Sequence, residues 1–593
     1  MNVPFEDSRR LTGANLYFDG PGVALESARG LVFDVATLQR WRDNIDRLRT
    51  ALGWPPGEVF VRQHPSGASL AFRAPIDQLY TAVEANEWAW HAALGSRAGD
   101  AAMPESDPPR PHAAHFDDDA ALLQLQALAR AEAKPELLAL IDAARARGVP
   151  AHADDEALSI GEGASSRTWP LDCLPAADAV PWAELHAIRK AVVTGSNGKT
   201  TTVRLLAAML REHGLRSGYS STDGLVVDGD NIDAGDFSGP VGARTVLRHP
   251  RVQAAVLETA RGGLLRRGLV VDDARVAVVT NVSADHFGEY GIHTLEDIAG
   301  VKLVVAKALA PDGVLVLNAD DAQLVQRADT VPAMRMGWFA LDLATASARS
   351  SLACGMRDGH LWLAVDGSEH DLGAIQAMPL ALGGSARYNI GNLAAAALAA
   401  WVLGIAAGDI ARVLARFGGA AGDNPGRLQR WILGHDARAV QVLLDYAHNP
   451  DGLRGLLQVA AGLRDGGRLG LVLGQAGNRE DVAIRELAEV AAEAQPDRIW
   501  LKDIAGDYLR GRARGEIAAI LFGALRSAGI PAAALPVCLD EVEAAQEALR
   551  WARPGDLLVL PIHEPVARDA VVALLDRLHA SGWRAGESLP AQP

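Results

Sequence analysis

Cysteines are few in this sequence, and they lie far apart. Among 593 residues the only cysteines are Cys173, Cys354 and Cys538, and no two of them form a CxxC motif. This pattern excludes a zinc ribbon and a disulfide framework, and it is typical of a protein kept in a reducing compartment. We therefore expect a cytoplasmic protein.

Positive charge and long apolar runs are also scarce. The formal net charge is −16, which disfavours binding to a nucleic-acid backbone. The alanine-rich run 393–407 is short, whereas a membrane span needs about 20 strongly apolar residues. The opening MNVPFEDSRR has no apolar core of a secretory signal. We expect no nucleic-acid partner and no membrane association, with 393–407 as a buried helix. A homo-oligomer is compatible with the sequence.

The pattern of strands and helices divides the chain into three predicted domains. Residues 1–185 contain short strand-like pieces and Trp-bearing helical stretches, which predict an α+β domain with a Pro- and Asp-rich linker at 97–119. The strand-like pieces are Leu31–Phe33, Val59–Val61 and Ser69–Phe72. Further on, strands and helices alternate, as in a parallel α/β sheet. We therefore predict a central α/β phosphate-loop domain over 186–425 and a C-terminal Rossmann-like α/β domain over 426–593.

The sequence VTGSNGKTT at 193–201 has the features of a phosphate-binding loop. It follows a buried strand, AVVT, and precedes an amphipathic helix. Glycines let the backbone turn tightly, so that consecutive N–H groups and the helix N-terminus face the phosphates. The alternative is a glycine-rich turn with a chance lysine. The predicted ATP-binding residues are Gly195, Ser196, Asn197, Gly198, Lys199, Thr200 and Thr201, with Lys199 at the terminal phosphates and the Thr200 hydroxyl on Mg²⁺.

Polar side chains follow two more predicted strands. Glu258 ends one strand, and Asn281 lies near the end of another, with Asp285 and His286 just after it. Ligands of open parallel sheets bind beyond the carboxyl ends of the strands, so we expect these groups near the triphosphate. With Thr200 they supply ligands for magnesium ions, which offset charge repulsion when a carboxylate attacks the γ-phosphate. Considered alone, His286 would more often be a structural or surface histidine.

The phosphate loop also carries a family resemblance. The general pattern G-x-x-x-x-G-K-[ST] needs glycine where this chain has Val193, whereas T-G-S-N-G-K-T resembles the loop of the Mur ligase superfamily. That resemblance implies ATP and Mg²⁺ as cofactors and a carbamylated Lys302 that helps hold a second magnesium ion. An ordinary helix lysine is the alternative at 302, because few lysines are neutral at pH 7.

The same resemblance extends over the second half of the chain. The segments that carry it are ARYNIGNLAAAALAA, GRLQRW and LLDYAHNPDGL. It implies that Asn389 and Asn392 lie near adenine, that Arg427 reaches the γ-phosphate and that Asp445 contacts the nucleotide. His448 and Asn449 would shape the cleft wall. Each match is weak by itself, since N-cap asparagines and buried aspartates are common.

Within the superfamily, residues 190 to 570 most resemble the Mur-like ligase half of the cyanophycin synthetases. Segments such as STDGLVVDG, VLETARGGLLRRGL, TNVSADHFG and ARPGDLLVL carry this likeness. In those enzymes this half adds arginine to aspartate side chains, and a separate ATP-grasp domain extends the aspartate backbone. The residues before the phosphate loop are too few for both an N-terminal domain and an ATP-grasp domain. We therefore expect a single amide-forming site and a retained N-terminal docking domain.

The activity implied by the resemblance is an ADP-forming ligation of a carboxylate to an amine through an acyl-phosphate. The expected partners are a small-molecule amino acid and an acidic, aspartate-like or peptide acceptor. Arg510 and Arg512 are candidates for holding the substrate carboxylate, and Asp503 and Glu564 for an ammonium group. Two alternatives stay open. One is a nucleotide-binding pseudoenzyme that recognises acidic polymer, and the other is a Mur ligase acting on a UDP-sugar peptide.

Overall fold

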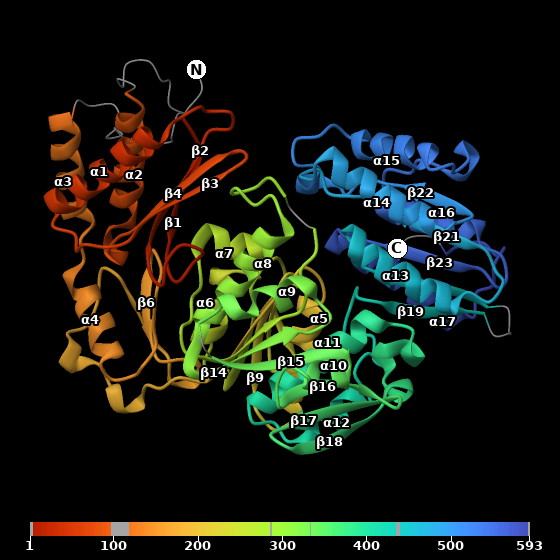
Figure 1. Cartoon of the computed structure of the whole chain (residues 1–593). Helices are drawn as coiled ribbons and strands as arrows, with labels where there is room; N and C mark the ends of the chain where they lie inside the picture. The colour runs from red at the N-terminus through yellow and green to blue at the C-terminus, as the bar shows by residue number, and fades with distance from the viewer. Residues whose placement is uncertain (1–3, 96–117, 285–286, 333, 435–438, 591–593) are drawn as a thin grey trace. The chain divides into compact units, whose positions relative to one another are not determined.

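The computed structural model describes residues 4–95, 118–284, 287–332, 334–434 and 439–590 (Figure 1). The chain forms two compact units that interleave along the sequence. The first unit contains most of the chain up to Trp338, and the second contains most of it from Phe339 onward. Among the short exchanged segments, Leu398–Ala406 belongs to the first unit. Each unit is described by itself below.

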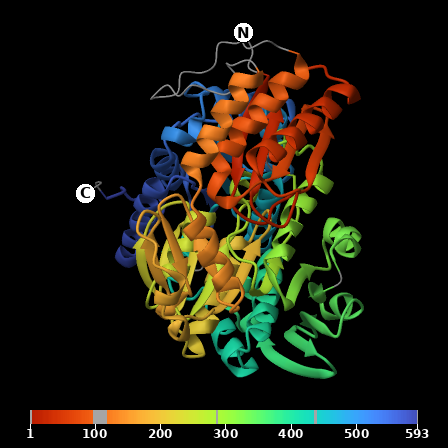
Figure 2. The same cartoon turned by 90° about the vertical axis from the view of Figure 1, so that its left-hand side faces the viewer.

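An antiparallel sheet with three helices forms the N-terminal part of the first unit (Figures 1 and 2). Trp41, Phe72 and Trp90 are buried in its core. The sheet order is β1-β2-β4-β3, with strands β1 (Phe5–Leu11), β2 (Gly22–Ser27), β3 (Val59–His64) and β4 (Gly67–Arg73). The helices are α1 (Val35–Leu52), α2 (Leu79–Leu94) and α3 (Asp118–Glu132). This is the α+β arrangement that the sequence predicts.

One detail of this part differs from the sequence prediction, and another falls almost wholly outside the described residues. The strand expected at Leu31–Phe33 is wrong, because Leu31 N donates to Ala28 O in a turn and Asp34 then caps α1 by accepting from Thr37 N. The predicted linker 97–119 lies outside the described residues except for its last two, which begin α3.

A small layer connects this part to the phosphate-loop sheet. It consists of α4 (Pro135–Arg145) and the antiparallel strands β5 (Ala151–Ala153), β6 (Ala157–Ile160) and β7 (Arg167–Pro170). The fully buried Glu162 carboxylate forms an ion pair with Lys190 and contacts His152 Nε2 at 2.8 Å. Lys190 Nζ also lies 2.8 Å from Asp273. These contacts attach the start of the next strand to the small layer.

The central sheet has five parallel strands in the order β9-β12-β8-β13-β14, with β10 and β11 antiparallel beside β9. Its strands contain buried runs of Val, Leu and Ala, as is typical of a parallel sheet covered on both faces. The strands are β8 (Arg189–Thr194), β9 (Ser217–Ser221), β10 (Gly224–Val227), β11 (Asp230–Asp233), β12 (Ala254–Glu258), β13 (Ala274–Val279) and β14 (Leu309–Asn318). The helices are α5 (Lys199–Glu212), α6 (Pro240–Arg248), α7 (Arg261–Arg267), α8 (Leu295–Leu303) and α9 (Ala322–Arg327).

The second unit begins with three antiparallel strands and an alanine-rich helix. Strand β15 (Arg335–Asp342) crosses the boundary between the units, and α10 (Leu343–Ser347), β16 (Leu352–Arg357), β17 (His360–Val365) and β18 (Ser368–Ala374) follow. Next come α11 (Arg387–Val402) and α12 (Ala407–Leu414). Residues 393–400 of α11 are fully buried, which confirms the buried helix expected there. No helix of the described residues is long and apolar enough to cross a membrane.

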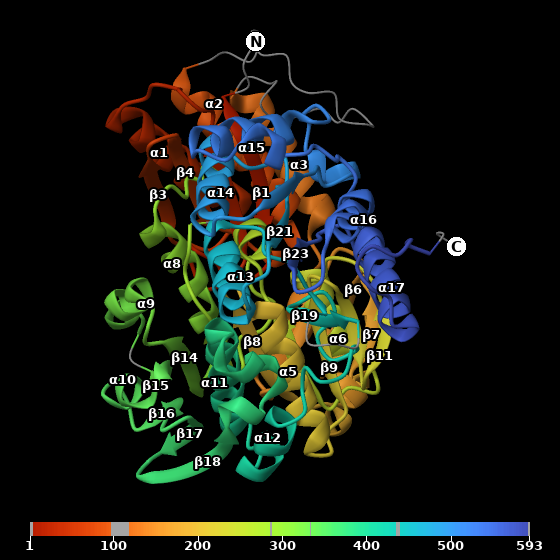
Figure 3. The same cartoon turned by 90° about the vertical axis from the view of Figure 1, so that its right-hand side faces the viewer.

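A second α/β sheet ends the chain (Figure 3). Its order is β19-β20-β23-β21-β22, parallel except for the edge strand β19. The strands are β19 (Gln429–Leu433), β20 (Val440–Asp445), β21 (Leu469–Leu473), β22 (Arg498–Leu501) and β23 (Leu557–Pro561). One face packs against α13 (Pro450–Leu463), α14 (Asp481–Glu493) and α15 (Glu516–Ser527), and the other against α16 (Glu541–Trp551) and α17 (Pro565–Ser581). The predicted α/β fold class is confirmed.

Candidate active site

The phosphate loop joins β8 to α5, as the sequence predicts. Gly195 and Gly198 have φ angles of 150° and 83°, which side-chain-bearing residues rarely adopt. A Cβ atom on Gly195 would lie 1.8 Å from the Thr280 hydroxyl, so only glycine fits where the loop passes β13. A helix N-terminus after a glycine-rich turn presents backbone N–H groups of the kind that bind phosphate oxygens.

Residues after β13 fix the loop from the neighbouring strand. The side chain of Asn281 accepts from Asn197 N at 2.9 Å and donates to Asn197 O at 3.0 Å. Ser196 N donates to Asn281 O at 3.0 Å, and Thr280 Oγ1 donates to Asn197 O at 2.6 Å. Asn281 therefore holds the loop shape, and its side-chain amide is used for that purpose.

Lys199 folds back over the loop that it belongs to. Its Nζ donates to the carbonyls of Gly195 and Ser196, both at 3.1 Å. A lysine held over the phosphate loop is placed to exchange these carbonyl contacts for charge-assisted hydrogen bonds to phosphate oxygens. This observation fits the phosphate role expected for Lys199.

Glu258 and Thr200 form the second part of the candidate site. Thr200 Oγ1 donates to one oxygen of the buried Glu258 carboxylate at 2.9 Å, and Thr222 Oγ1 donates to the other at 2.7 Å. The carboxylate thus lies at the end of β12, in contact with the first turn of α5. A hydroxyl and a carboxylate side by side at a phosphate loop are oxygen donors of the kind that Mg²⁺ prefers.

Lys302 is the third candidate metal-binding residue and lies buried in α8. Burial raises the pKa of the nearby Asp321 carboxyl, and the charge of Lys302 opposes that shift. Asp321 itself accepts from Val282 N at 2.6 Å and thereby connects α9 to the end of β13. The fourth candidate, His286, lies outside the described residues. Within the described residues, no group of three or more His, Cys, Asp or Glu side chains could by itself hold a metal ion.

In the second unit, Arg427 and Asp445 lie together near the end of β20. The Arg427 guanidinium is 4.2 Å from the centre of the Tyr446 ring. Asp445 accepts from Leu428 N at 2.7 Å. Burial raises the pKa of Asp445, although the charge of Arg427 acts against this. Of the two predicted nucleotide-binding residues, Arg427 is therefore positioned by the Tyr446 ring, and Asp445 by the backbone N–H of Leu428.

The other predicted residues of the second unit have local structural contacts. Asn389 Nδ2 donates to Leu380 O at 3.2 Å, and Asn392 Nδ2 donates to Asn389 Oδ1 at 3.0 Å, at the start of α11. Asn449 caps α13 by accepting from Gly452 N at 2.8 Å, and His448 Nδ1 lies 3.1 Å from Tyr446 O. These contacts leave their ligand roles as predictions.

The two candidate substrate arginines differ. Arg512 donates to the carbonyls of Gly477 and Arg479 at 2.9 and 2.7 Å and pairs with Asp481 and Glu516. It holds the loop after β21 to the start of α15. Arg510 is exposed and has a positive φ of 50°, so its backbone is strained at a turn.

A buried cluster at three strand ends was not predicted from the sequence. Lys502, directly after β22, forms an ion pair with Glu541 at the start of α16, and its Nζ donates to His563 Nδ1 at 2.9 Å. His563 Nε2 donates to Ala447 O at 3.0 Å, after β20. All three side chains are at most 3% exposed. The available signal was a polar residue within two positions of the end of an apolar strand, Lys502 after β22 and His563 after β23.

Asp503 adds a carboxylate next to this cluster. Its Oδ2 accepts from Gly515 N at 2.6 Å, whereas no hydrogen-bond partner for the buried Oδ1 lies among the described residues. Glu564, the other ammonium candidate, accepts from Ala567 N and caps α17. A buried carboxylate oxygen without a donor favours a ligand with N–H groups.

The fold and the site define the chain as a phosphate-loop α/β protein with a second α/β domain. Polar residues follow the strands of that second domain. Comparison with known families gives the finer assignment. Residues 193–400 match the Mur ligase middle domain family, and residues 426–561 match the family of the Mur ligase, glutamate ligase domain. The chain belongs to the Mur ligase family.

The relatives include cyanophycin synthetases and UDP-N-acetylmuramoyl-L-alanyl-D-glutamate–2,6-diaminopimelate ligases. The cyanophycin synthetase of Synechocystis sp. is 38% identical over 373 residues, which is 62% of this chain and 42% of that protein. The chain thus matches about two fifths of the length of such relatives. The UDP-N-acetylmuramoyl-L-alanyl-D-glutamate–2,6-diaminopimelate ligase of Xanthomonas oryzae pv. oryzae is 32% identical over 393 residues, covering 64% of this chain and 73% of that one.

Solved structures were also compared. E. coli FolC in complex with DHPP and ADP aligns with a TM-score of 0.49 and 19% identity, covering 66% of this chain and 89% of that chain. MurF from Acinetobacter baumannii aligns with a TM-score of 0.46 and 17% identity, covering 66% of this chain and 77% of that chain.

Proposed function

We propose that the chain is an ATP-dependent, ADP-forming ligase that joins an acidic acceptor to an amino acid through an amide bond. The observation that carries the proposal is the phosphate loop with Lys199 over it and the Thr200–Glu258 pair beside it. These groups lie inside a Mur ligase middle domain. The relatives support the class of reaction, and the substrates are part of the proposal.

The proposed roles of the residues follow from their charge and their position in the site. The acceptor carboxylate attacks the γ-phosphate, which gives an acyl-phosphate and ADP, and the amine then displaces phosphate from the acyl carbon. Lys199 and Arg427 stabilise the negative charge that develops on the transferred group. Thr200, Glu258, His286 and Lys302, the last as a carbamate, would hold Mg²⁺, which supplies charge neutralisation when bound. Asn389, Asn392 and Asp445 are proposed to contact the nucleotide.

For the amine substrate, the favoured location is the set of strand ends in the second unit. Asp503 supplies a buried carboxylate oxygen for an ammonium or guanidinium group. The exposed Arg510 supplies a cation for a carboxylate, whereas Arg512 orders the loop and acts on the substrate only through it. His448 and Asn449 lie at the end of β20 as the proposed cleft wall.

The two alternative functions are a pseudoenzyme and a ligase that acts on UDP-sugar peptides. If the chain were a pseudoenzyme that recognises acidic polymer, we would expect the phosphate-binding and metal-binding side chains to be lost. Lys199, Thr200 and Glu258 are all present, Lys199 contacts the phosphate loop, and Thr200 contacts Glu258. A ligase for UDP-sugar peptides is favoured by relatives such as the ligase of Xanthomonas oryzae pv. oryzae. The two proposed ligase functions use the same reaction, and they differ only in the acceptor substrate.

An ADP-release assay tests the proposal. Purified protein, ATP and Mg²⁺ are combined with single amino acids and short acidic peptides, and ADP and phosphate are measured separately. We expect release only when both an acceptor and an amine are present. Lys199→Ala should lower the rate more than tenfold while circular dichroism stays unchanged, because the substitution removes a charge and no core packing. AMP and pyrophosphate as products would contradict the acyl-phosphate route.

A further inference from the structure

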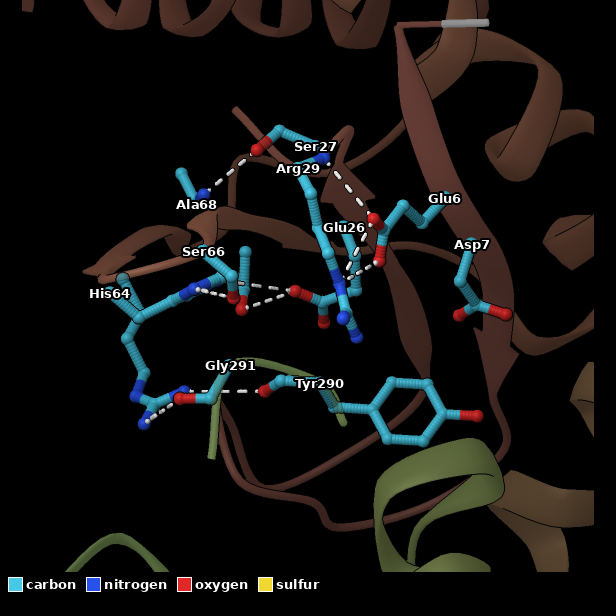
Figure 4. A network of polar contacts seen from close by, with 12 residues as sticks. Glu6, Asp7, Glu26, Ser27, Arg29, His64, Ser66, Ala68, Tyr290 and Gly291 are labelled. Atoms are coloured by element: carbon cyan, nitrogen blue, oxygen red, sulfur yellow. Dashed lines mark hydrogen bonds and ion pairs between the residues drawn. The ribbon is translucent and has the colours of Figure 1, made fainter. Parts of the chain in front are cut away.

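The N-terminal sheet holds the segment that leads into the helix carrying Lys302. Arg62, on β3, donates to Gly291 O at 2.9 Å, and Arg29 donates to Gly288 O at 3.0 Å. Figure 4 shows Arg29 and His64 of the N-terminal part in the same region as Tyr290 and Gly291. Residues 288–294 begin two positions after His286 in the sequence and end at the start of α8. Side chains of one domain therefore bind the backbone between two proposed metal-binding positions of another.

Arg62 also reaches α8 itself. Its guanidinium donates to Asp297 Oδ1 at 2.7 Å, and both side chains are 26% exposed. Asp297 is part of the capping box of α8, since its other oxygen accepts from Thr294 N at 3.0 Å while Thr294 Oγ1 accepts from Asp297 N at 3.1 Å. Because a capping box fixes the first turn, the ion pair ties the direction of the helix to β3.

The shape of the segment requires the N-terminal sheet to be in place. Gly291 has a φ of 67°, and a Cβ there would lie 2.3 Å from the His64 ring, so the two residues are in direct contact. Tyr290 has an unusual positive φ of 54°, and its ring packs against the Arg9 guanidinium at 4.5 Å. A backbone strained at a non-glycine residue persists only where its surroundings hold it.

Behind these contacts lies a buried anion. Glu26, on β2, accepts from Arg9 and Ser69 at 2.7 Å each, and its carboxylate lies 3.5 Å from His64 Nε2. Burial raises the pKa of Glu26. His64 and Arg9 lower it by a larger amount, so the net shift of the pKa is downward. The ionised carboxylate thus fixes Arg9 and lies beside His64, and these two side chains pack on residues 290 and 291.

We propose that Arg62, Arg29 and His64, termed the N-terminal clamp, position residues 288–297 for catalysis, with Arg62 as the principal positioning residue. These residues lie in the sequence between the proposed metal-binding residues His286 and Lys302. The N-terminal domain is then a working part of the ligase site as well as any docking role it has. The inference rests on the proposed function only for its catalytic consequence. The contacts themselves make a separate prediction about the order of residues 288–297.

The test compares Arg62→Met with a matched control, Arg248→Met. Arg248 also forms an Arg–Asp pair between layers, with Asp154 at 2.6 Å and exposures of 22% and 24%, but it lies on α6 and does not contact residues 288–297. Two readouts are used on the full chain. One is hydrogen–deuterium exchange of peptides covering 288–297 without ligands, and the other is the Mg²⁺ concentration that gives half-maximal ADP release.

We expect Arg62→Met to speed exchange in 288–297 and to raise the half-maximal Mg²⁺ concentration at least fivefold, with little change at saturating Mg²⁺. Arg248→Met should change neither. Gly291→Ala should act like Arg62→Met, and Asp297→Asn tests the same ion pair if Arg62→Met does not fold. Unchanged exchange, or faster exchange with an unchanged Mg²⁺ requirement, overturns the inference. Absence of ADP release from the parent protein would instead contradict the proposed function, and the exchange data would still decide whether the clamp orders the segment.

Discussion

The Thr200 hydroxyl donates a 2.9 Å hydrogen bond to Glu258, whose carboxylate also accepts from Thr222. This bond joins the first turn of α5 to the end of β12 at the point where magnesium is expected.

Replacing Glu258 by glutamine tests that site. Glutamine keeps an acceptor for Thr200 but removes the charge that would hold Mg²⁺, so turnover should fall by about 100-fold. The melting temperature should change little. ADP release over a range of Mg²⁺ concentrations measures the effect. Thr222→Val is the control, because it removes one hydrogen bond to the carboxylate and keeps the charge. Equal activities for Glu258→Gln and the parent would exclude a metal role for Glu258.

Lys302→Ala tests the proposed carbamate. The variant should be nearly inactive, and short-chain carboxylates such as acetate should partly restore ADP release by occupying the place of the carbamate. Lys307→Ala is a matched control five residues on, since Lys307 is bound to Asp19 and Asn15 O instead. Full activity of Lys302→Ala would rule the carbamate out. So would intact protein in which the buried Lys302 side chain is an unmodified amine.

Asp503→Asn tests the amine site. The substitution keeps an acceptor for Gly515 N but removes the negative charge of the carboxylate, whose Oδ1 has no hydrogen-bond partner among the described residues. We expect KM for the amine to rise at least tenfold, with smaller changes in KM for ATP and in kcat. Asp497→Asn, in a half-exposed pair with Arg464, is the control. A variant whose KM for every amine matches that of the parent would contradict the assignment.

The buried cluster around His563 predicts acid sensitivity. Burial and the charge of Lys502 lower the pKa of His563 from its usual 6.5, while Glu541 acts in the opposite direction. The unfolded chain therefore binds a proton near pH 6 that the folded chain does not, and the free energy of unfolding falls as the pH drops below 6.5. The carboxyl of Glu541, whose pKa is lowered, adds a loss only at more acidic pH.

Calorimetry of the parent and of His563→Gln between pH 7.5 and 5.5 measures this contribution. The melting temperature of the parent should fall over this range, and the fall should be smaller in the variant because the titrating group is gone. A parallel pH dependence in both proteins would show that His563 does not titrate differently on folding.

The phosphate loop and its strand could be predicted because the signal is local. The run from Val193 to Thr201 carries its glycines, its lysine and the flanking apolar residues within one short segment. The buried strands of both parallel sheets are similarly continuous apolar runs, such as Leu557–Pro561 in β23.

Contacts between distant residues left no such trace. Glu26 and Arg62 look like ordinary strand charges in the sequence, and only pairing of β2, β4 and β3 brings them to one side of the sheet. Lys502 and His563 are separated by 61 positions and meet because β22 and β23 lie in one sheet. The strand expected at Leu31–Phe33 failed for the converse reason, because a local apolar triplet cannot show that the next residue starts a helix.

The ion pair between Lys190 and Glu162 bears on how the protein can be divided. The sequence places a domain boundary at residue 186, between these two partners. A shortened chain starting there would keep the buried ammonium group of Lys190 and Asp273 but lose Glu162, and breaking a buried pair costs about 3–5 kcal/mol. The ligase part should therefore be cut ahead of β5. Activity lost on cutting at 186 would report a damaged phosphate-loop strand rather than a missing docking domain.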